Sequence, residues 1–176
     1  MPRHERSLTM QSETSLSSAT FKMYAGQDKW RVTTQDKSNT YLQLEFGGSS
    51  VLASSSGGLP LCDIHFAGMM VSDYQISLNT PSPRYTRLTL SFPATFQTSY
   101  RIRLTDIFGQ QHRYYWSPLN KRTFCLYEKG FSQPIAQFQS KPFQSKIGSI
   151  SFTLPQDPQD ELIFLTSLAF ILNASR

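Results

Sequence analysis

The most restrictive feature of the sequence is an apolar run near its C-terminal end. Between Leu162 and Leu172, only two hydroxyl residues interrupt a series of Leu, Ile, Phe and Ala. Asp157 is a favourable N-cap and Pro158 suits the first helical turn, so we predict a helix over about 158–172. Its apolar side chains surround most of the helix, which must therefore be buried on nearly all sides or lie in lipid. The run of eleven residues is much shorter than the about 20 that span a bilayer, so we predict no transmembrane span.

The chain before this helix breaks into short runs separated by Gly, Pro, Ser, Asn and Asp. A spacing of about ten residues between the runs is typical of an all-β sandwich or barrel. A closed, wide sheet has an interior that such a helix can fill, so we predict a mainly β closed barrel around it. Gly47–Ser50 and Ser54–Gly58 are expected to be flexible loops. The predicted strands are 21–24, 30–34, 41–46, 59–66, 74–78, 85–92, 100–105, 113–117, 123–128, 135–139 and 146–154.

Alternation within these runs predicts which side chains face the interior. The clearest case is the run 100–105, in which Tyr100, Ile102 and Leu104 alternate with Arg101 and Arg103. Successive side chains of a strand point to opposite faces, so we expect both arginines to face solvent.

The length of 176 residues fits a single domain with its own core. Residues 1–20 are rich in Ser and Thr and lack hydrophobic periodicity, so we expect a disordered tail followed by a domain over 21–176. The two cysteines and the missing signal-peptide pattern support neither a disulfide framework nor secretion. We therefore expect an intracellular, cytoplasmic protein.

Basic residues concentrate in one segment of the chain. Residues 84–146 hold ten Lys or Arg against two Asp or Glu, whereas 1–83 hold six against seven and 147–176 hold one against three. Such a local excess attracts phosphates of lipid or nucleic acid, although a charge run can also be only a solvated surface.

No catalytic or metal site can be nominated from the sequence. Cys62 and His65 are three residues apart on a predicted strand and point to opposite faces, which makes them a poor metal pair. The chain has no nucleophile elbow, phosphate-binding loop or dinucleotide fingerprint. The aromatic run 113–116 could stack bases, but core packing is the simpler explanation, so nucleic acid is not a favoured partner. We expect a protein without enzymatic activity, cofactor or metal.

The second half of the chain carries a distinct order of residues: Asp106 and Gly109 in a turn, Tyr114 and Trp116 on a strand, the runs 124–126, 134–138 and 147–150, and Asp160, Glu161, Leu162 and Thr166 in the helix. This order resembles that of the fungal members of the tubby C-terminal-like superfamily, whose fold relatives are tubby, LURP-one and phospholipid scramblase proteins. The resemblance implies a barrel of about twelve strands around a central hydrophobic C-terminal helix. Tubby proteins bind phosphoinositides through basic residues, and the resemblance assigns no particular residue of this chain to that role.

Two functional hypotheses follow. In the first, the domain associates peripherally with membranes and binds anionic phospholipid headgroups, phosphoinositides in particular. In the second, it is a protein interaction or scaffold domain without a small ligand, and its basic residues only keep it soluble. The candidate lipid-binding residues of the first hypothesis are Arg84, Arg87, Arg101, Arg103, Arg113, Lys121 and Arg122.

Overall fold

The structure is a computed structural model that describes residues 19–35, 39–68, 73–143 and 146–176, apart from the side chain of residue 142. Most of the expected disordered tail lies outside these ranges, and the first strand begins at Thr20. Within them, the chain forms twelve strands and one helix. They are β1 (Thr20–Ala25), β2 (Lys29–Thr34), β3 (Thr40–Phe46), β4 (Ser50–Ser54), β5 (Pro60–Phe66), β6 (Asp73–Leu78), β7 (Tyr85–Ser91), β8 (Tyr100–Asp106), β9 (Gln111–Asn120), β10 (Thr123–Glu128), β11 (Ala136–Phe143), β12 (Lys146–Phe152) and α1 (Pro158–Ala174).

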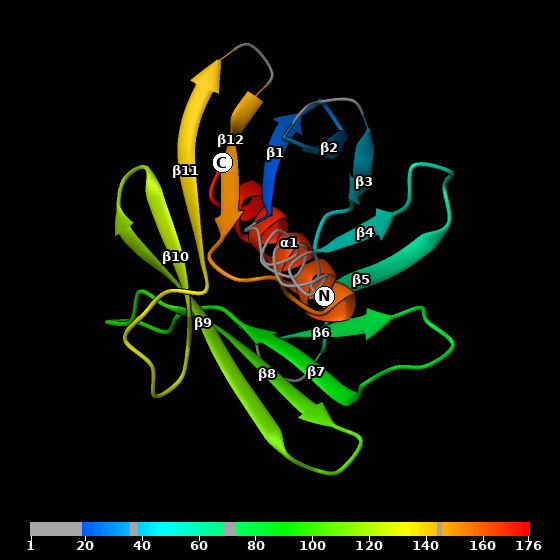
Figure 1. Cartoon of the computed structure of the whole chain (residues 1–176), viewed down its shortest axis with the longest axis vertical. Coiled ribbons are helices and arrows are strands. Elements are labelled where there is room, and N and C mark those ends of the chain that lie inside the picture. Colours follow the sequence, from blue (N-terminus) through cyan, green and yellow to red (C-terminus); the bar gives the residue numbers. More distant parts are fainter. Residues whose placement is uncertain (1–18, 36–38, 69–72, 144–145) are drawn as a thin grey trace, which may run out of the picture.

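The strands form a closed antiparallel barrel. Each strand pairs with its neighbours in the sequence, and β1 pairs with β12 to close the ring. Figure 1 shows this ring, with α1 enclosed by the strands. The predicted mainly β barrel of about twelve strands around a C-terminal helix is therefore confirmed.

One strand was not predicted. β4 (Ser50–Ser54) lies between two stretches that we expected to be loops, and it pairs with both β3 and β5. Serines at both ends make this segment look like a loop in the sequence, but Val51 and Ala53 are buried and alternate with half-buried positions. Pairing on both sides stabilises a strand that its own composition does not favour.

The orientation predicted for β8 is confirmed. Ile102 and Leu104 are fully buried, whereas Arg101 and Arg103 are exposed. Tyr100 is half-buried, and its ring packs 5.0 Å from the ring of Phe92.

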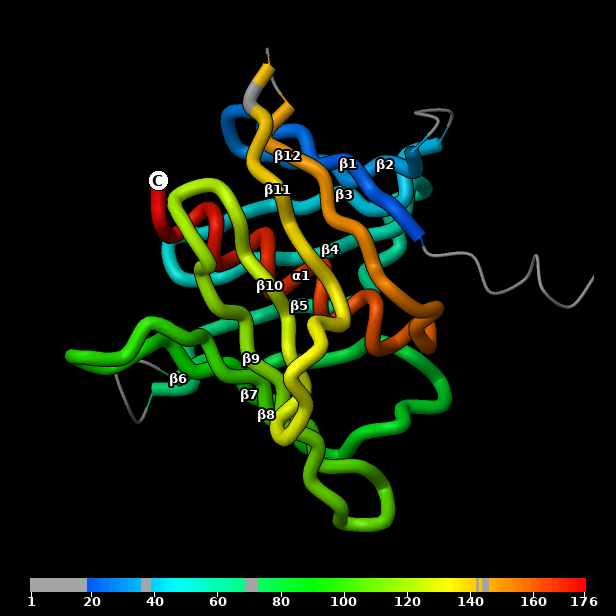
Figure 2. The backbone as a smooth tube through the Cα atoms, turned by 60° about the vertical axis from the view of Figure 1, so that its left-hand side comes forward, coloured from blue at the N-terminus to red at the C-terminus, as the bar shows by residue number. Residues whose placement is uncertain are grey.

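The C-terminal helix begins and packs as its sequence indicates. The Asp157 side chain accepts a hydrogen bond from the Gln159 backbone N–H at 2.9 Å, and Pro158 is the first helical residue. Every residue from Ile163 to Ile171 is buried, and in Figure 2 β10 and β11 pass in front of the helix. No helix in the described ranges has the length and hydropathy of a membrane-spanning segment.

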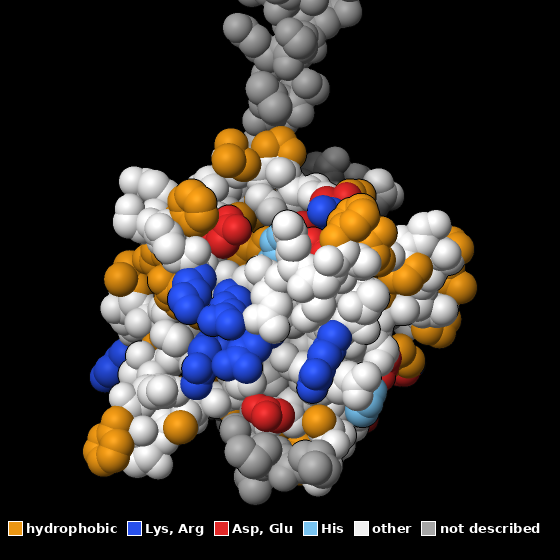
Figure 3. Space-filling view, turned by 90° about the horizontal axis from the view of Figure 1, so that it is seen from below, with side chains coloured by type: hydrophobic (Ala, Val, Ile, Leu, Met, Phe, Trp, Pro, Cys, Tyr) orange, Lys and Arg blue, Asp and Glu red, His pale blue; other side chains and the backbone are white. Residues whose placement is uncertain are grey.

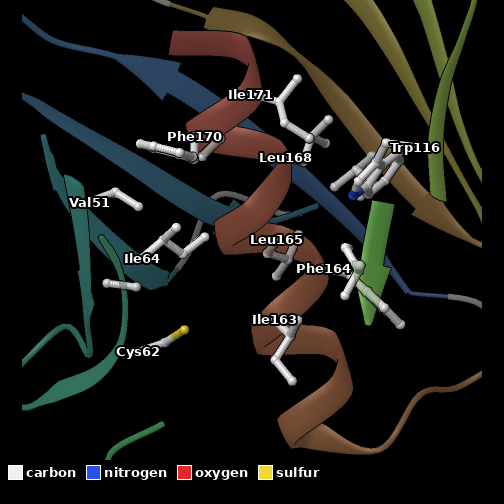
Figure 4. Close-up of a cluster of buried hydrophobic side chains, with 14 of the residues drawn as sticks. Val51, Cys62, Ile64, Trp116, Ile163, Phe164, Leu165, Leu168, Phe170 and Ile171 are labelled. Carbon is white, nitrogen blue, oxygen red and sulfur yellow. The ribbon is translucent and has the colours of Figure 1, made fainter. Parts of the chain in front are cut away.

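The helix is the centre of the core. Figure 4 shows Val51 and Ile64 on one side of it and Trp116 on the other. The Trp116 indole N–H donates to the Ser167 hydroxyl at 3.2 Å, and this hydroxyl donates to the Phe164 carbonyl at 3.0 Å. The polar atoms of Trp116 and Ser167 are therefore satisfied inside the core, whereas the buried Thr166 hydroxyl makes no hydrogen bond with the described residues.

Candidate functional site: a basic face on β7 to β10

The barrel register brings cations from separate strands into one row. Arg103 on β8 is the register partner of Arg113 on β9. The backbone N–H of Lys129, the residue after β10, donates to the Arg113 carbonyl at 2.9 Å. Side chains of register partners lie about 5 Å apart at their Cβ atoms, so three cations follow one another across the outer surface.

Two further arginines extend this row along the strands. Arg101 precedes Arg103 by two residues and points to the same side of β8. Arg87 on β7 pairs with Thr105, which makes it a diagonal neighbour of Arg103. We call Arg87, Arg101, Arg103, Arg113 and Lys129 the basic face.

The charges of the basic face are not neutralised. Among the described residues, the ion pairs involve none of its five members. Arg101 donates to the Gln97 side-chain oxygen and Arg113 to that of Gln111, both at 3.0 Å, but these acceptors are uncharged. Like charges directly opposite on neighbouring strands repel, so an anion bound here would relieve an existing repulsion.

The basic face borders a hollow in the surface. A groove of about 490 Å³ is lined by Arg101, Arg103, Arg113 and Lys129 together with aromatic residues that include Tyr115. The ring of Tyr115 stacks on Tyr127 of β10 at 5.4 Å. Figure 3, which views the molecule from below, shows a cluster of Lys and Arg side chains left of the centre of this face, with other cations apart from it. The groove can therefore hold an anionic group against fixed cations and an aromatic wall.

The other candidate residues lie elsewhere. Arg84 stands at the helix end of the barrel, where its Nη1 lies 3.1 Å from Asp157 Oδ1 and 3.4 Å from Asp160 Oδ2. Lys121 and Arg122 form the exposed turn between β9 and β10. An extended strand carries Lys121 on the order of 25 Å from Arg113. The structure thus brings together four of the seven predicted residues: Arg87, Arg101, Arg103 and Arg113.

Lys129 is a member of the basic face that we did not predict. It directly follows the predicted strand 123–128, and it falls in the basic segment of the sequence. Its place beside Arg113 depends on the β9–β10 register, which includes a bulge at Thr123 and Phe124. The local charge excess was the only sequence signal for it.

A second polar cluster fixes the start of the helix. The Tyr41 hydroxyl donates to Glu161 at 2.6 Å, and the Tyr85 hydroxyl donates to Asp160. Burial raises the pKa of both carboxyl groups above their ordinary values. Perturbed carboxyl groups can mark active sites, but here each one accepts from a barrel tyrosine and anchors α1 to the rim.

Histidine and cysteine side chains form no metal site in the described ranges. Cys62 is buried, whereas His65 is half-exposed and its Nδ1 lies 2.9 Å from Asp63. This arrangement matches the prediction that Cys62 and His65 face opposite sides of their strand.

The architecture defines the class of the protein as a closed twelve-stranded barrel with a buried C-terminal helix. No family model and no curated protein matches the sequence. Among solved structures, the chain is similar to the X-ray structure of a protein from Arabidopsis thaliana. The TM-score is 0.60 at 12% sequence identity, over 90% of this chain and 91% of that chain. A likeness at this identity concerns the fold alone.

Proposed function

We propose that this protein is a non-enzymatic domain that binds anionic phospholipid headgroups through the basic face. The observation that carries the proposal is the row Arg103–Arg113–Lys129, whose three cations are adjacent and lack a carboxylate partner among the described residues. Opposite charges across neighbouring strands stabilise a sheet, whereas like charges directly opposite each other destabilise it. A row of like charges is therefore better explained by binding of an anion than by a contribution to stability.

The chemistry of the row suits phosphate groups. Guanidinium groups bind phosphate oxygens through two parallel hydrogen bonds, and an ammonium group adds a mobile point charge. Arg103 and Arg113 lie side by side, and Arg101 and Lys129 flank them at the groove. A headgroup that carries phosphates on a ring, as phosphoinositides do, could contact several of these cations at once.

The proposal also includes a protein family and a cellular location for this domain. The resemblance to fungal tubby C-terminal-like proteins suggests phosphoinositides as the lipid class, and the barrel with its central helix is compatible with that resemblance. The predicted intracellular location would place the basic face opposite the anionic cytoplasmic leaflet, which attracts basic surfaces.

Sedimentation with vesicles tests the proposal. We expect the protein to bind vesicles containing phosphatidylinositol phosphates or phosphatidylserine more strongly than phosphatidylcholine vesicles, with binding that weakens as salt rises. Vesicles matched for total charge would separate phosphoinositide recognition from general attraction to anions. Competition by soluble inositol phosphates would show whether the headgroup alone is sufficient.

A charge-matched pair of variants locates the site. Arg103→Gln with Arg113→Gln should weaken vesicle binding by about 2 kcal/mol, roughly thirty-fold, at about 1 kcal/mol per cation near the surface. Lys121→Gln with Arg122→Gln removes the same charge from the β9–β10 turn and should weaken binding much less. Both variants should keep the melting temperature, because exposed charges contribute little to stability. Equal losses in the two variants would contradict a site at the basic face.

The alternative is a protein interaction or scaffold domain. It is favoured by exposed apolar residues on the turns that follow β8 and β10, namely Ile107, Phe108 and Phe131. No preference for anionic vesicles at low salt would overturn the lipid proposal and leave this alternative.

A further inference from the structure

The loop between β7 and β8 holds an aromatic side chain in a costly arrangement. Phe96 has a φ of 74°, and the other four described residues with positive φ are all glycines. It occupies the third position of a turn that the Gln97 N–H closes on the Ala94 carbonyl at 2.9 Å. Positive φ at this position is normally supplied by Gly or Asn, and a bulky residue there is strained.

The Phe96 ring is not packed against the described residues in a way that would offset this strain. The side chain is completely exposed, with a relative accessibility of 102%. The strained backbone and the ring exposed to water therefore both raise the free energy of the protein when no ligand is bound. Strain of this kind persists where the surrounding structure enforces it, and it concentrates at binding sites.

The loop around Phe96 is anchored on both sides. Phe92 at its base packs against Tyr100 and against Phe170 of α1, with ring centroids 5.0 and 5.8 Å apart. On the other side, the Arg101 guanidinium donates to the Gln97 side chain at 3.0 Å. The aromatic ring is thus presented outward from a fixed base.

The residues beside Phe96 indicate which kind of ligand it contacts. It lines the same groove as Arg101, Arg103, Arg113 and Lys129. Figure 3 shows apolar side chains protruding from the edge of the side that carries the cluster of cations. An exposed aromatic ring beside unpaired cations matches a membrane interface, where cations meet lipid phosphates and aromatic rings lie at headgroup depth.

We infer that Phe96 is a membrane-inserting anchor that enters the lipid interface when the basic face binds headgroups. This inference rests on the proposed function. It adds which side of the domain faces the membrane and which side chain enters the lipid interface. The β7–β8 loop points toward the bilayer, and the groove opens onto the headgroup layer. The ring loses its contact with water, which offsets the strain of its backbone.

Tryptophan fluorescence measures insertion directly. The chain's two tryptophans, Trp30 and Trp116, are 3% and 0% exposed, so neither should respond to vesicles. In a Phe96→Trp variant, anionic vesicles should shift the added emission to shorter wavelength, and brominated lipids should quench it. Phe108→Trp is the matched control, because Phe108 is also highly exposed, at 84%, but lies on the β8–β9 turn.

The outcomes separate the two proposals. If the Phe96→Trp variant sediments with anionic vesicles while its added emission stays unshifted and unquenched, insertion is overturned and the headgroup proposal stands. Absence of sedimentation by the wild-type protein would overturn both. Equal responses at positions 96 and 108 would also overturn insertion by this loop.

A second variant separates anchoring from a structural role. Phe96→Gly should raise the melting temperature, because glycine adopts a positive φ without strain. The same variant should weaken binding to anionic vesicles about ten- to a hundredfold, since an aromatic ring no longer leaves water. A Phe96→Gly variant that binds as tightly as wild type, or that melts at a lower temperature, would contradict the inference.

Discussion

At the scale of single residues, the arginines of this protein divide by their partners. Arg84 lies within ion-pair distance of two carboxylates at the start of α1, so its charge serves the structure. Arg103 and Arg113 face each other and meet only neutral acceptors or solvent in the described ranges. Because both kinds are arginines, the partners of each side chain are the feature that nominates a site.

The thiol of Cys62 permits a prediction about reactivity. Burial raises its pKa to about 12, and only the thiolate reacts with disulfide reagents. We expect native protein at pH 9 to react very slowly and urea-unfolded protein to react at once. Since the unfolded thiol ionises near pH 8.5, this group should also lower the free energy of unfolding as pH rises above that value.

A Cys125→Ala variant provides the measurement, because it leaves Cys62 as the only thiol of the chain. Labelling is followed with a chromogenic disulfide at pH 7, 8 and 9, with and without urea. Rates for native protein that match a free thiol would show that the site is open to solvent.

Sequence reasoning could assign the side-chain direction of a residue but not its neighbours across strands. The alternation around Ile102 correctly placed Arg101 and Arg103 on the outer surface. It could not pair Arg103 with Arg113 or place Lys129 beside them, since these contacts depend on register. Nor could it assign Arg84 to the helix end, because the acids it meets lie more than seventy residues away in the chain.

At the scale of elements, a helix or strand could be predicted where its local sequence pattern was strong, but not where that pattern was weak. The cap at Asp157 and the apolar run fixed the helix closely, and the structure extends it by two residues to Ala174. By contrast, β4 has only Val51 and Ala53 as inward apolar residues. Its identity as a strand depends on β3 and β5, which no local pattern can reveal.

The pairing of β11 with β12 depends on a glycine. Gly148 is buried opposite Ser140 and Met23, and a Cβ there would collide with the Gln139 carbonyl and the Phe138 ring. We expect Gly148→Ala to lower the free energy of unfolding by about 1–3 kcal/mol, the usual effect of overpacking.

Gly48 provides the control for this prediction, because a Cβ added there meets no atom within 4 Å. Gly48→Ala should change stability by no more than about 0.5 kcal/mol. Urea unfolding of both variants gives the comparison, and equal stabilities would refute the close approach at Gly148.

At the scale of the whole molecule, the helix and the barrel require each other. A helix with apolar side chains all around and too short to span a bilayer must be enclosed, and this argument predicted the interior position correctly. The sequence alone could not show that the ring closes between β1 and β12, because that pairing joins the two ends of the sheet.

Removal of the helix is therefore the sharpest test of the architecture. Deletion of residues 158–176 takes away Phe164, Leu165, Leu168 and Ile171, all of them fully buried. Burying each such side chain contributes about 1.5–3 kcal/mol, whereas a whole domain is stable by only about 5–15 kcal/mol. The truncated chain cannot close its strands over a filled interior, so we expect insoluble or molten protein without a cooperative thermal transition.

Two companion variants show whether this loss comes from the interior. Deletion of only Ser175 and Arg176, which are exposed beyond the helix, should leave a cooperative transition near the wild-type temperature. Leu165→Asp keeps the full length but places a carboxyl group at a fully buried position, where an unpaired charge is strongly unfavourable. It should therefore behave like the long deletion. If the 158–176 deletion instead stays soluble and melts cooperatively near the full-length temperature, the strands must hold a core of their own, and the helix would have to be an external element.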